Sequence, residues 1–231
     1  EIMPSLVGSE MCIRDSLKAG VMEEGKVLAA ERGTPQGGII SPILANIYLH
    51  YVLDLWFERK VKKQLKGYAR LIRYADDFVV CFQSEKEAHA FGEMLKERLA
   101  KFGLRISEKK SRIIAFGRYV WQRAQRERGK VETFDFLGFT HYCDKTRKGA
   151  FKMGHKTASQ RFRQKAKELN AWLKRVRNWV KLEEWWRVLQ QKLVGHYRYY
   201  GISGNYPALR RFYRLAFKLA YKWINRRSQK K

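Results

Sequence analysis

The first regular pattern in the chain is a segment that is apolar around most of its circumference, at about residues 42–62. A serine followed by a proline marks its start, as is common where helices begin, so the segment is predicted to be a helix. A helix that is apolar nearly all round is expected to be buried. Its polar side chains, Asn46, His50 and Asp54, are four residues apart and therefore share one face.

The stretch YARLIRYADDFVVCFQS predicts a β-hairpin. Two short runs, residues 68–74 and 78–82, are rich in aromatic and β-branched side chains, which favour strands. Asp76 and Asp77 lie between them and are therefore expected at the tip of the hairpin.

Four further patterns follow between residues 86 and 142. Helical spacing runs over residues 86–102, and Gly103 is predicted to end that helix. Residues 104–114, LRISEKKSRII, predict a strand, a basic turn and a second strand. A charged loop is expected over residues 123–130, and FDFLGFTHY, residues 134–142, predicts a strand that contains a glycine.

After about Gly154 the pattern changes to long amphipathic helices crowded with Lys and Arg. Thr157 and Gln160 predict a capping box at the start of the first helix. The second helix is expected over about residues 183–200, and the third from near Pro207. The chain is therefore predicted to consist of an α+β core followed by a basic three-helix bundle.

Charge separates these two parts. The formal net charge is +27, and residues 151–231 contain 22 Lys and Arg against 3 Asp and Glu. So concentrated a basic excess predicts a polyanionic partner. Nucleic acid is favoured over a membrane surface because no lipid-anchoring signal accompanies the charge, and no membrane partner is expected.

The cysteines and the apolar runs bear on the cellular compartment and on whether the chain spans a membrane. The 3 cysteines are odd in number and far apart, which predicts neither a disulfide framework nor a zinc site and suits a reducing, cytoplasmic compartment. The longest apolar stretch, residues 39–57, is interrupted by polar and charged residues, so it is not expected to span a membrane.

Residues 1–16, EIMPSLVGSEMCIRDS, resemble translated adapter sequence and lack the pattern of a signal peptide. We predict that they are a non-native leader and exclude them from the fold predictions. On this interpretation the authentic protein starts further upstream and the chain is a fragment.

Asp76 and Asp77 are the first candidates for chemistry. Aspartates are common in turns because they bond to local backbone groups, and that explanation remains open for this pair. The alternative is that they bind Mg²⁺, which prefers hard oxygen ligands from carboxylates and phosphates. A bound cation would also remove the repulsion between adjacent carboxylates.

Two further segments have both an ordinary and a functional interpretation. GTPQGG, residues 33–38, is either a simple glycine turn or a loop whose backbone approaches a nucleotide closely, with Gln36 offering a donor and an acceptor. Lys109 and Lys110 are either solvated turn residues or, beside a polyphosphate, groups that neutralise or protonate a leaving group.

The order of these motifs resembles the later palm motifs of reverse transcriptases. GTPQGGIISPILANIYL and the C-terminal GHYRYYGISGNYPALRRFYRLAFKLAYKWINRRSQ resemble group II intron reverse transcriptases and maturases over residues 17–231. The resemblance implies an α+β right-hand polymerase palm fragment, with an antiparallel sheet and helices, over residues 17–154. It implies a basic α-helical thumb, or X domain, over residues 155–231.

The resemblance also implies residue roles. Asp76 and Asp77 match the metal-binding aspartates of the YADD box, with Mg²⁺ as cofactor, and Lys110 is the closest match to a lysine that assists pyrophosphate departure. The positions that match contacts to the nucleotide and the primer end are Gln36, Gly37, Tyr74 and Ala75. The implied activity is RNA-directed DNA polymerase and splicing maturase, with intron RNA, a DNA primer or target and deoxynucleoside triphosphates as partners.

One element of the family pattern is missing. The first metal aspartate of the family lies on a strand that precedes the PQG loop, but residues 17–32 contain no Asp. We therefore expect that the fingers and that carboxylate were lost by truncation and that the chain alone cannot polymerise.

The bundle carries the predicted RNA contacts. Lys and Arg on helix exteriors are often only a solvated face, but 3 acids are too few to pair with 22 basic residues. The alternative function is a non-catalytic RNA-binding splicing factor on the same scaffold. The predicted RNA-binding residues are Arg161, Arg163, Lys165, Tyr197, Arg198, Tyr199, Arg210 and Arg211. Tyr200 is also expected to offer a surface on which unpaired bases stack.

Overall fold

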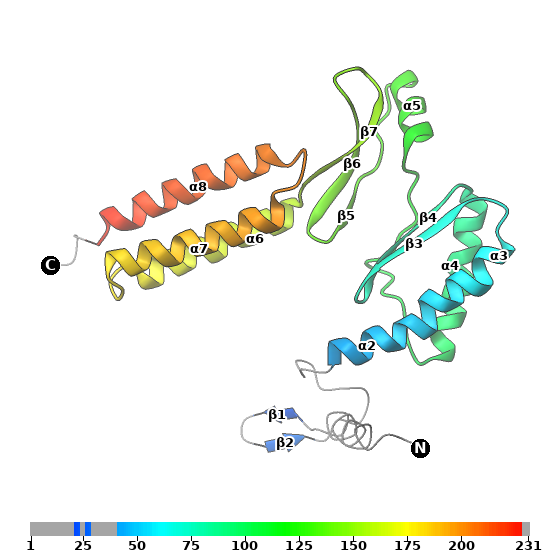
Figure 1. The fold of residues 1–231 in the computed structure, drawn as a ribbon, viewed down its shortest axis with the longest axis horizontal. Coiled ribbons are helices and arrows are strands. Elements are labelled where there is room, and N and C mark those ends of the chain that lie inside the picture. Colours follow the sequence, from blue (N-terminus) through cyan, green and yellow to red (C-terminus); the bar gives the residue numbers. More distant parts are fainter. Residues whose placement is uncertain (1–20, 24–25, 29–40, 228–231) are drawn as a thin grey trace, which may run out of the picture. The chain divides into compact units, whose positions relative to one another are not determined.

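The computed structural model describes residues 21–23, 26–28 and 41–227, the first two ranges as backbone only. The chain forms two compact units, which divide between Ile113 and Ile114. Figure 1 shows helices and antiparallel strands in the chain, so the predicted α+β fold class is confirmed. The division into a palm fragment that ends at residue 154 and a thumb that starts at residue 155 stays a prediction.

The first unit contains a continuous helical segment. It consists of α2 (Ser41–Leu49), the π-helical stretches η1 (His50–Asp54) and η2 (Phe57–Val61), and α3 (Lys62–Gln64). The helix predicted at about residues 42–62 is confirmed. The prediction that it is buried throughout is wrong, because Ile43, Ile47 and Tyr51 in its first half are more than half exposed.

Among the described residues, only the second half of this helical segment packs against a hydrophobic core. The core of the first unit is formed by that half, by Ala69 and by the helix that follows the hairpin. The apolar side chains on one face of the hairpin pack against this core. Its buried residues are Val52, Leu53, Phe57, Val61, Ala69, Phe91, Leu95 and Leu99.

The predicted hairpin is confirmed. Strands β3 (Ala69–Tyr74) and β4 (Asp77–Phe82) are antiparallel, and Tyr74 pairs with Asp77 next to the turn. Helix α4 (Glu85–Lys101) follows, and Gly103, with a φ of 68°, ends it as predicted. Strands β1 (Val21–Glu23) and β2 (Lys26–Leu28) form a separate antiparallel pair.

The two strands predicted within residues 104–114 are wrong, although the turn between them is present. The backbone N–H groups of Lys110 and Ser111 donate to the Ser107 carbonyl oxygen, which closes a turn. Leu104 and Ile106 pack against the first core, but in the part of the chain that the structure describes no neighbouring strand pairs with this segment. A strand needs such a partner for its backbone groups.

The second unit begins with a helix and a three-stranded sheet. Helix α5 (Arg118–Arg126) occupies part of the region predicted to be a charged loop. Strands β5 (Phe134–Phe136), β6 (Phe139–Lys145) and β7 (Phe151–Thr157) are antiparallel in that order. The predicted single strand at residues 134–142 is instead a hairpin, because Leu137 and Gly138 have positive φ and form its two-residue turn.

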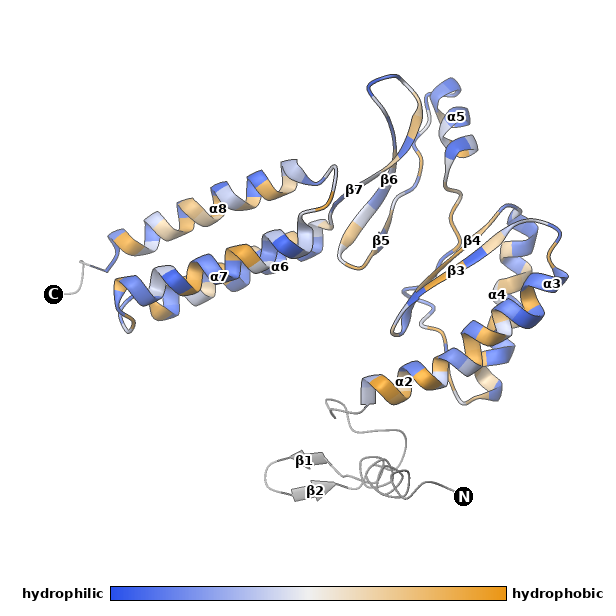
Figure 2. Ribbon diagram, in the orientation of Figure 1, coloured by the Kyte–Doolittle hydropathy of each residue, from blue (hydrophilic) through white to orange (hydrophobic). Residues whose placement is uncertain are grey.

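The three-helix bundle is confirmed. Helices α6 (Ser159–Val176), α7 (Leu182–Tyr200) and α8 (Tyr206–Asn225) enclose a core of Leu, Ala and aromatic side chains. Figure 2 shows how hydrophobic and hydrophilic residues alternate along these helices, as expected for amphipathic helices with one buried face. No helix among residues 41–227 is both long and apolar enough for a membrane span.

The predicted capping box is wrong, since Thr157 ends β7 and bonds elsewhere. Its N–H donates to Oδ1 of Asn205 at 2.8 Å, and its Oγ1 accepts from Nδ2 of Asn205 at 2.9 Å. Nδ2 of Asn205 also donates to the Tyr200 carbonyl oxygen at 2.8 Å. Asn205 is fully buried, so one side chain joins the end of the sheet to the link between α7 and α8.

Replacing Asn205 by Ala should lower the free energy of unfolding of the second unit by about 2–3 kcal/mol, because it leaves buried donors and acceptors without partners. The measurement is urea unfolding followed by tryptophan fluorescence. Ser203→Ala, in the same loop but exposed, is the matched control and should change little. Equal effects of the two substitutions would show that the Asn205 bonds do not stabilise this junction.

Candidate active site

The two aspartates lie at the closed end of the β3–β4 hairpin. Ala75 and Asp76 form the turn, and Asp77 is the first residue of β4. Ala75 has a φ of 53°, in the left-handed region that residues with a Cβ rarely adopt. Such a conformation persists only where surrounding contacts hold it, and it is typical of functional turns.

The alternation of side chains along the hairpin puts Asp77 on its open face. Leu71, Phe78 and Val80 pack against the core of the first unit. Successive side chains of a strand point to opposite faces, so Tyr74 and Asp77 project from the other face. Tyr74 is 66% exposed, and Asp76 and Asp77 are exposed as well. The tip is therefore open to solvent and not sealed in a hydrophobic core.

Neither aspartate is neutralised by another of the described residues. Among the described residues, no side chain donates a hydrogen bond to the Asp76 or Asp77 carboxylate or forms an ion pair with it. Two adjacent carboxylates without partners repel each other and attract cations. They suit Mg²⁺, which typically takes one or two protein carboxylates and completes its shell with water and phosphate oxygens. No group of three or more potential metal ligands occurs within the described residues.

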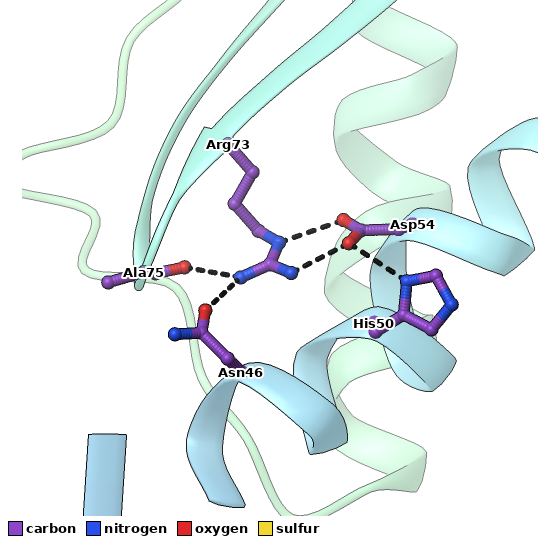
Figure 3. Close-up of polar contacts among 5 residues, drawn as sticks. All are labelled: Asn46, His50, Asp54, Arg73 and Ala75. Atoms are coloured by element: carbon purple, nitrogen blue, oxygen red, sulfur yellow. Dashed lines mark hydrogen bonds and ion pairs between the residues drawn. The ribbon is translucent and has the colours of Figure 1, made fainter. Parts of the chain in front are cut away.

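Arg73 connects the turn to the helical segment (Figure 3). Its Nε and Nη2 donate to the two carboxylate oxygens of Asp54, at 2.8 and 2.6 Å. Its Nη1 donates to Oδ1 of Asn46 at 2.9 Å and to the carbonyl oxygen of Ala75 at 2.8 Å. The Arg73 guanidinium thus links the Ala75 carbonyl of the turn to Asn46 and Asp54 on the helical segment.

His50 completes this polar cluster, with its Nδ1 3.4 Å from Oδ2 of Asp54. Burial raises the pKa of the Asp54 carboxyl, but the hydrogen bonds and charge of Arg73, helped by His50, outweigh it, so the pKa lies below its ordinary value of 3.8. The hydrogen bond to Asp54 raises the pKa of Arg73. Both groups are therefore charged at neutral pH and form a two-pronged ion pair.

Asn46, His50, Asp54 and Arg73 were not among the predicted site residues. The signal was present in part: the three helix residues form the polar stripe noted in the sequence. The strand pattern gives no sign that Arg73 forms hydrogen bonds with this polar stripe, so the sequence did not identify the cluster.

Of the other predicted site residues, some lie beside the aspartates and others do not. Tyr74 and Ala75 flank the aspartates, whereas Gln36 and Gly37 lie outside the described residues. Lys110 is exposed on the turn that follows α4. In the described ranges no hydrogen bond or ion pair joins Lys110 to either aspartate. The roles of these residues stay predictions.

The predicted RNA-binding residues all lie on the bundle helices. Most of them are exposed, and the exposed ones are Arg161, Arg163, Lys165, Arg198, Tyr199, Arg210 and Arg211. Lys165 is paired with Glu168 at 2.8 Å, and the guanidinium of Arg211 lies over the Phe162 ring.

The tyrosines of α7 are less available for stacking than expected. Tyr200 is buried, so its expected contact with bases is wrong, and Tyr197 is half-buried, with a pKa raised by burial. Tyr199 is 55% exposed, but one face of its ring stacks on Phe139 and its hydroxyl donates to the Leu137 carbonyl oxygen. A base could stack only on its other face.

Comparison with known proteins gives the family. The family model described as reverse transcriptase (RNA-dependent DNA polymerase) matches residues 4–141, which include the hairpin, the two aspartates and part of the 1–16 segment that we excluded from the fold predictions.

Three relatives match shorter stretches. The group II intron-encoded protein LtrA of Lactococcus lactis subsp. cremoris is 34% identical over 98 residues, which cover 42% of this chain and 16% of LtrA. Protein YkfC of Escherichia coli is 32% identical over 96 residues, covering 31% of the chain and 25% of YkfC. An uncharacterized 91 kDa protein in the cob intron of Schizosaccharomyces pombe is 46% identical over 55 residues, which cover 24% of this chain and 7% of that protein. The chain thus matches a quarter or less of each relative, and the resemblance to the group II intron proteins is confirmed.

Replacing Arg73 by Met should raise the hydrogen-exchange rates of the amides around the hairpin turn. The Asp54 carboxylate and the Ala75 carbonyl lose charged donors, which corresponds to about 1.5–3 kcal/mol of local stability. Arg70→Met, on the same strand but exposed, is the matched control. Similar exchange in both variants would contradict a positioning role for Arg73.

The Asp54–Arg73 pair also predicts how stability changes with pH. The folded-state pKa of Asp54 is lowered, so its stabilisation is present above the unfolded-state pKa of about 3.9 and is lost as pH falls through the folded-state pKa. The difference in unfolding free energy between the wild type and Asp54→Asn should therefore be largest near neutral pH and shrink in acid. A difference that stays constant down to strongly acidic pH would refute this assignment.

Proposed function

This chain belongs to the reverse transcriptase (RNA-dependent DNA polymerase) family, and from that premise we propose that it carries part of the active site of an RNA-directed DNA polymerase together with a maturase domain that binds intron RNA. The observation that carries the first half is the pair of exposed, unpaired carboxylates on a turn held by Arg73. The observation that carries the second half is the basic bundle.

Asp76 and Asp77 hold Mg²⁺ in this proposal. When bound, the metal activates the primer 3′-hydroxyl and stabilises the charge on the leaving pyrophosphate. Tyr74 and Ala75 lie next to these carboxylates and contact the primer end. Gln36 and Gly37 line the incoming deoxynucleoside triphosphate, and Lys110 donates a proton to the departing pyrophosphate.

Two carboxylates are too few for the full reaction. Polymerases that use two metal ions clamp both the attacking and the leaving oxygen, and the family resemblance assigns a further aspartate to a strand before the PQG loop. Residues 17–40 contain no Asp, so the acid that completes the site is not in that stretch. We infer that the residues of this chain do not polymerise without it.

The bundle supplies the affinity for RNA. Residues 151–231 contain 22 basic and 3 acidic side chains, and most of the predicted contact residues are exposed. Phosphate contacts by Lys and Arg release bound counterions and account for most sequence-independent affinity. In a cytoplasmic ribonucleoprotein this surface would hold the intron RNA while it folds for splicing.

A non-catalytic RNA-binding splicing factor is the second candidate. It is favoured by the same basic bundle and by the absence of a third acid near Asp76 and Asp77 among the described residues. The two functions differ in their need for metal. A pure RNA-binding protein has no use for two unneutralised carboxylates on a strained turn.

Metal binding distinguishes these candidates. The purified chain should bind Mn²⁺, used as a paramagnetic substitute for Mg²⁺, and the double substitution Asp76→Asn and Asp77→Asn should abolish that binding. Glu108→Gln, which removes a negative charge from an exposed turn, is the control and should leave it unchanged. Mn²⁺ binding that is unaffected by the double substitution would refute the metal site.

Primer extension tests the inferred incompleteness of the site. The 231-residue chain, supplied with Mg²⁺, an RNA template, a DNA primer and deoxynucleoside triphosphates, should yield no extended product. Extension that disappears on Asp76→Asn would show that the chain is a complete polymerase and overturn that inference.

RNA binding should weaken steeply with salt, because each phosphate contact that is lost contributes about one unit to the slope of log affinity against log salt concentration. Replacing Arg210 and Arg211 by Gln should lower the affinity and the slope together. The measurement is fluorescence anisotropy with a labelled RNA. An affinity that is equal at low and moderate salt would contradict the electrostatic surface.

A further inference from the structure

Helix α8 carries a four-residue repeat on its outer side. Residues 213–224 read YRLA, FKLA and YKWI, so an aromatic residue followed by a cation recurs every four positions. The aromatic and cationic positions of all three units are exposed, whereas the last two positions of each unit are buried or half-buried. We call the six exposed residues the α8 ladder: Tyr213, Arg214, Phe217, Lys218, Tyr221 and Lys222.

The rings of the ladder are not part of the bundle core. Tyr213 is 55% exposed, Phe217 61% and Tyr221 64%. The bundle core uses the opposite side of α8, through Phe212 and Trp223 and the alanines between them. Within the described part of the chain, none of the three ladder rings stacks on another aromatic ring. Their faces are therefore available to a ligand.

The spacing of the rings suits unstacked bases. Four residues of α-helix rise about 6 Å, so successive rings follow one ridge of the helix at that interval. A strand of duplex DNA rises only about 3.4 Å per nucleotide, so a continuous base stack does not match the ladder. Splayed, unpaired nucleotides do, because aromatic side chains bind them by stacking on their exposed faces.

The charges favour RNA over a protein partner. Every ladder ring is followed by Arg or Lys, and no Asp or Glu follows Glu184 in the sequence. The cores of protein interfaces are poor in charged residues and in lysine especially. A line of aromatic rings with a cation beside each ring is the combination found in grooves for single strands, where the cations contact the phosphates.

We propose that the α8 ladder binds an unpaired segment of RNA, with bases stacked on Tyr213, Phe217 and Tyr221 and phosphates paired with the adjacent Arg214, Lys218 and Lys222. This inference rests on the proposed RNA-binding function of the bundle and adds to it a preference for single strands. None of these six residues was among the predicted RNA contacts.

The experiment compares two RNAs and two sets of variants of the full chain. The probes are a labelled oligouridylate and an RNA duplex of the same length, titrated at about 50 and 200 mM salt. Each of the substitutions Tyr213→Ala, Phe217→Ala and Tyr221→Ala should weaken binding of the single strand about tenfold. Duplex binding and the salt slope should stay nearly constant.

Substituting the cations gives a different result. The combination Arg214→Gln, Lys218→Gln and Lys222→Gln should weaken binding of both RNAs and lower the salt slope by about three. Tyr119→Ala, on α5 and 82% exposed, is the matched aromatic control and should change neither affinity. Circular dichroism checks that the variants remain helical.

The outcomes separate this inference from the proposed function. If the wild type binds neither RNA, the proposed RNA-binding function fails. If the wild type binds both RNAs but the aromatic substitutions leave single-strand affinity unchanged, the ladder inference alone fails. If those substitutions instead change only the sedimentation behaviour of the chain, the ladder is a protein interface and the inference is overturned.

Discussion

The candidate active site depends on one interaction, the two-pronged ion pair between Arg73 and Asp54. The same guanidinium donates to the carbonyl oxygen of Ala75, the turn residue with a positive φ. An exposed two-residue turn with that conformation would otherwise be strained and mobile. Because Arg73 joins it to a helix that packs in the core, the neighbouring Asp76 and Asp77 project from a defined position. In the proposed metal site, the preorganisation that metal-dependent chemistry requires thus comes from residues that are not proposed to bind the metal.

In the proposed function the two units have different roles, the first in chemistry and the second in affinity for RNA. Among the described residues the Asp76 and Asp77 carboxylates have no hydrogen-bond or ion-pair partner, which suits a site for a cation and a polyphosphate. Residues 151–231 of the second unit contain 22 basic and 3 acidic side chains, and the exposed side chains of α8 combine that charge with aromatic rings. Charge neutralisation is therefore expected from the ligands: metal for the hairpin and RNA phosphates for the bundle.

Sequence patterns predicted the parts of this structure that rest on local periodicity. The hairpin with its acids, helix α4 and the bundle helices follow from apolar spacing and glycine stops. Two of the failures have a common physical cause, because each needed a tertiary partner that the pattern does not contain. Residues 104–114 alternate like strands but lack a neighbouring strand, and Thr157 bonds to Asn205 instead of capping a helix. The Arg73 contacts and the exposed side of α8 were also not predicted, because the sequence does not show which side chains meet or which helix faces stay exposed.

Iron-mediated cleavage shows whether Asp76 and Asp77 bind a divalent metal at the tip of the hairpin. In this experiment Fe²⁺ replaces Mg²⁺, and the hydroxyl radicals that it generates with peroxide cut the backbone close to the bound ion. We expect cuts clustered within residues 72–79, suppressed by excess Mg²⁺ and lost when both aspartates are replaced by Asn. Cleavage that is spread along the chain, or that persists in the doubly substituted protein, would contradict it.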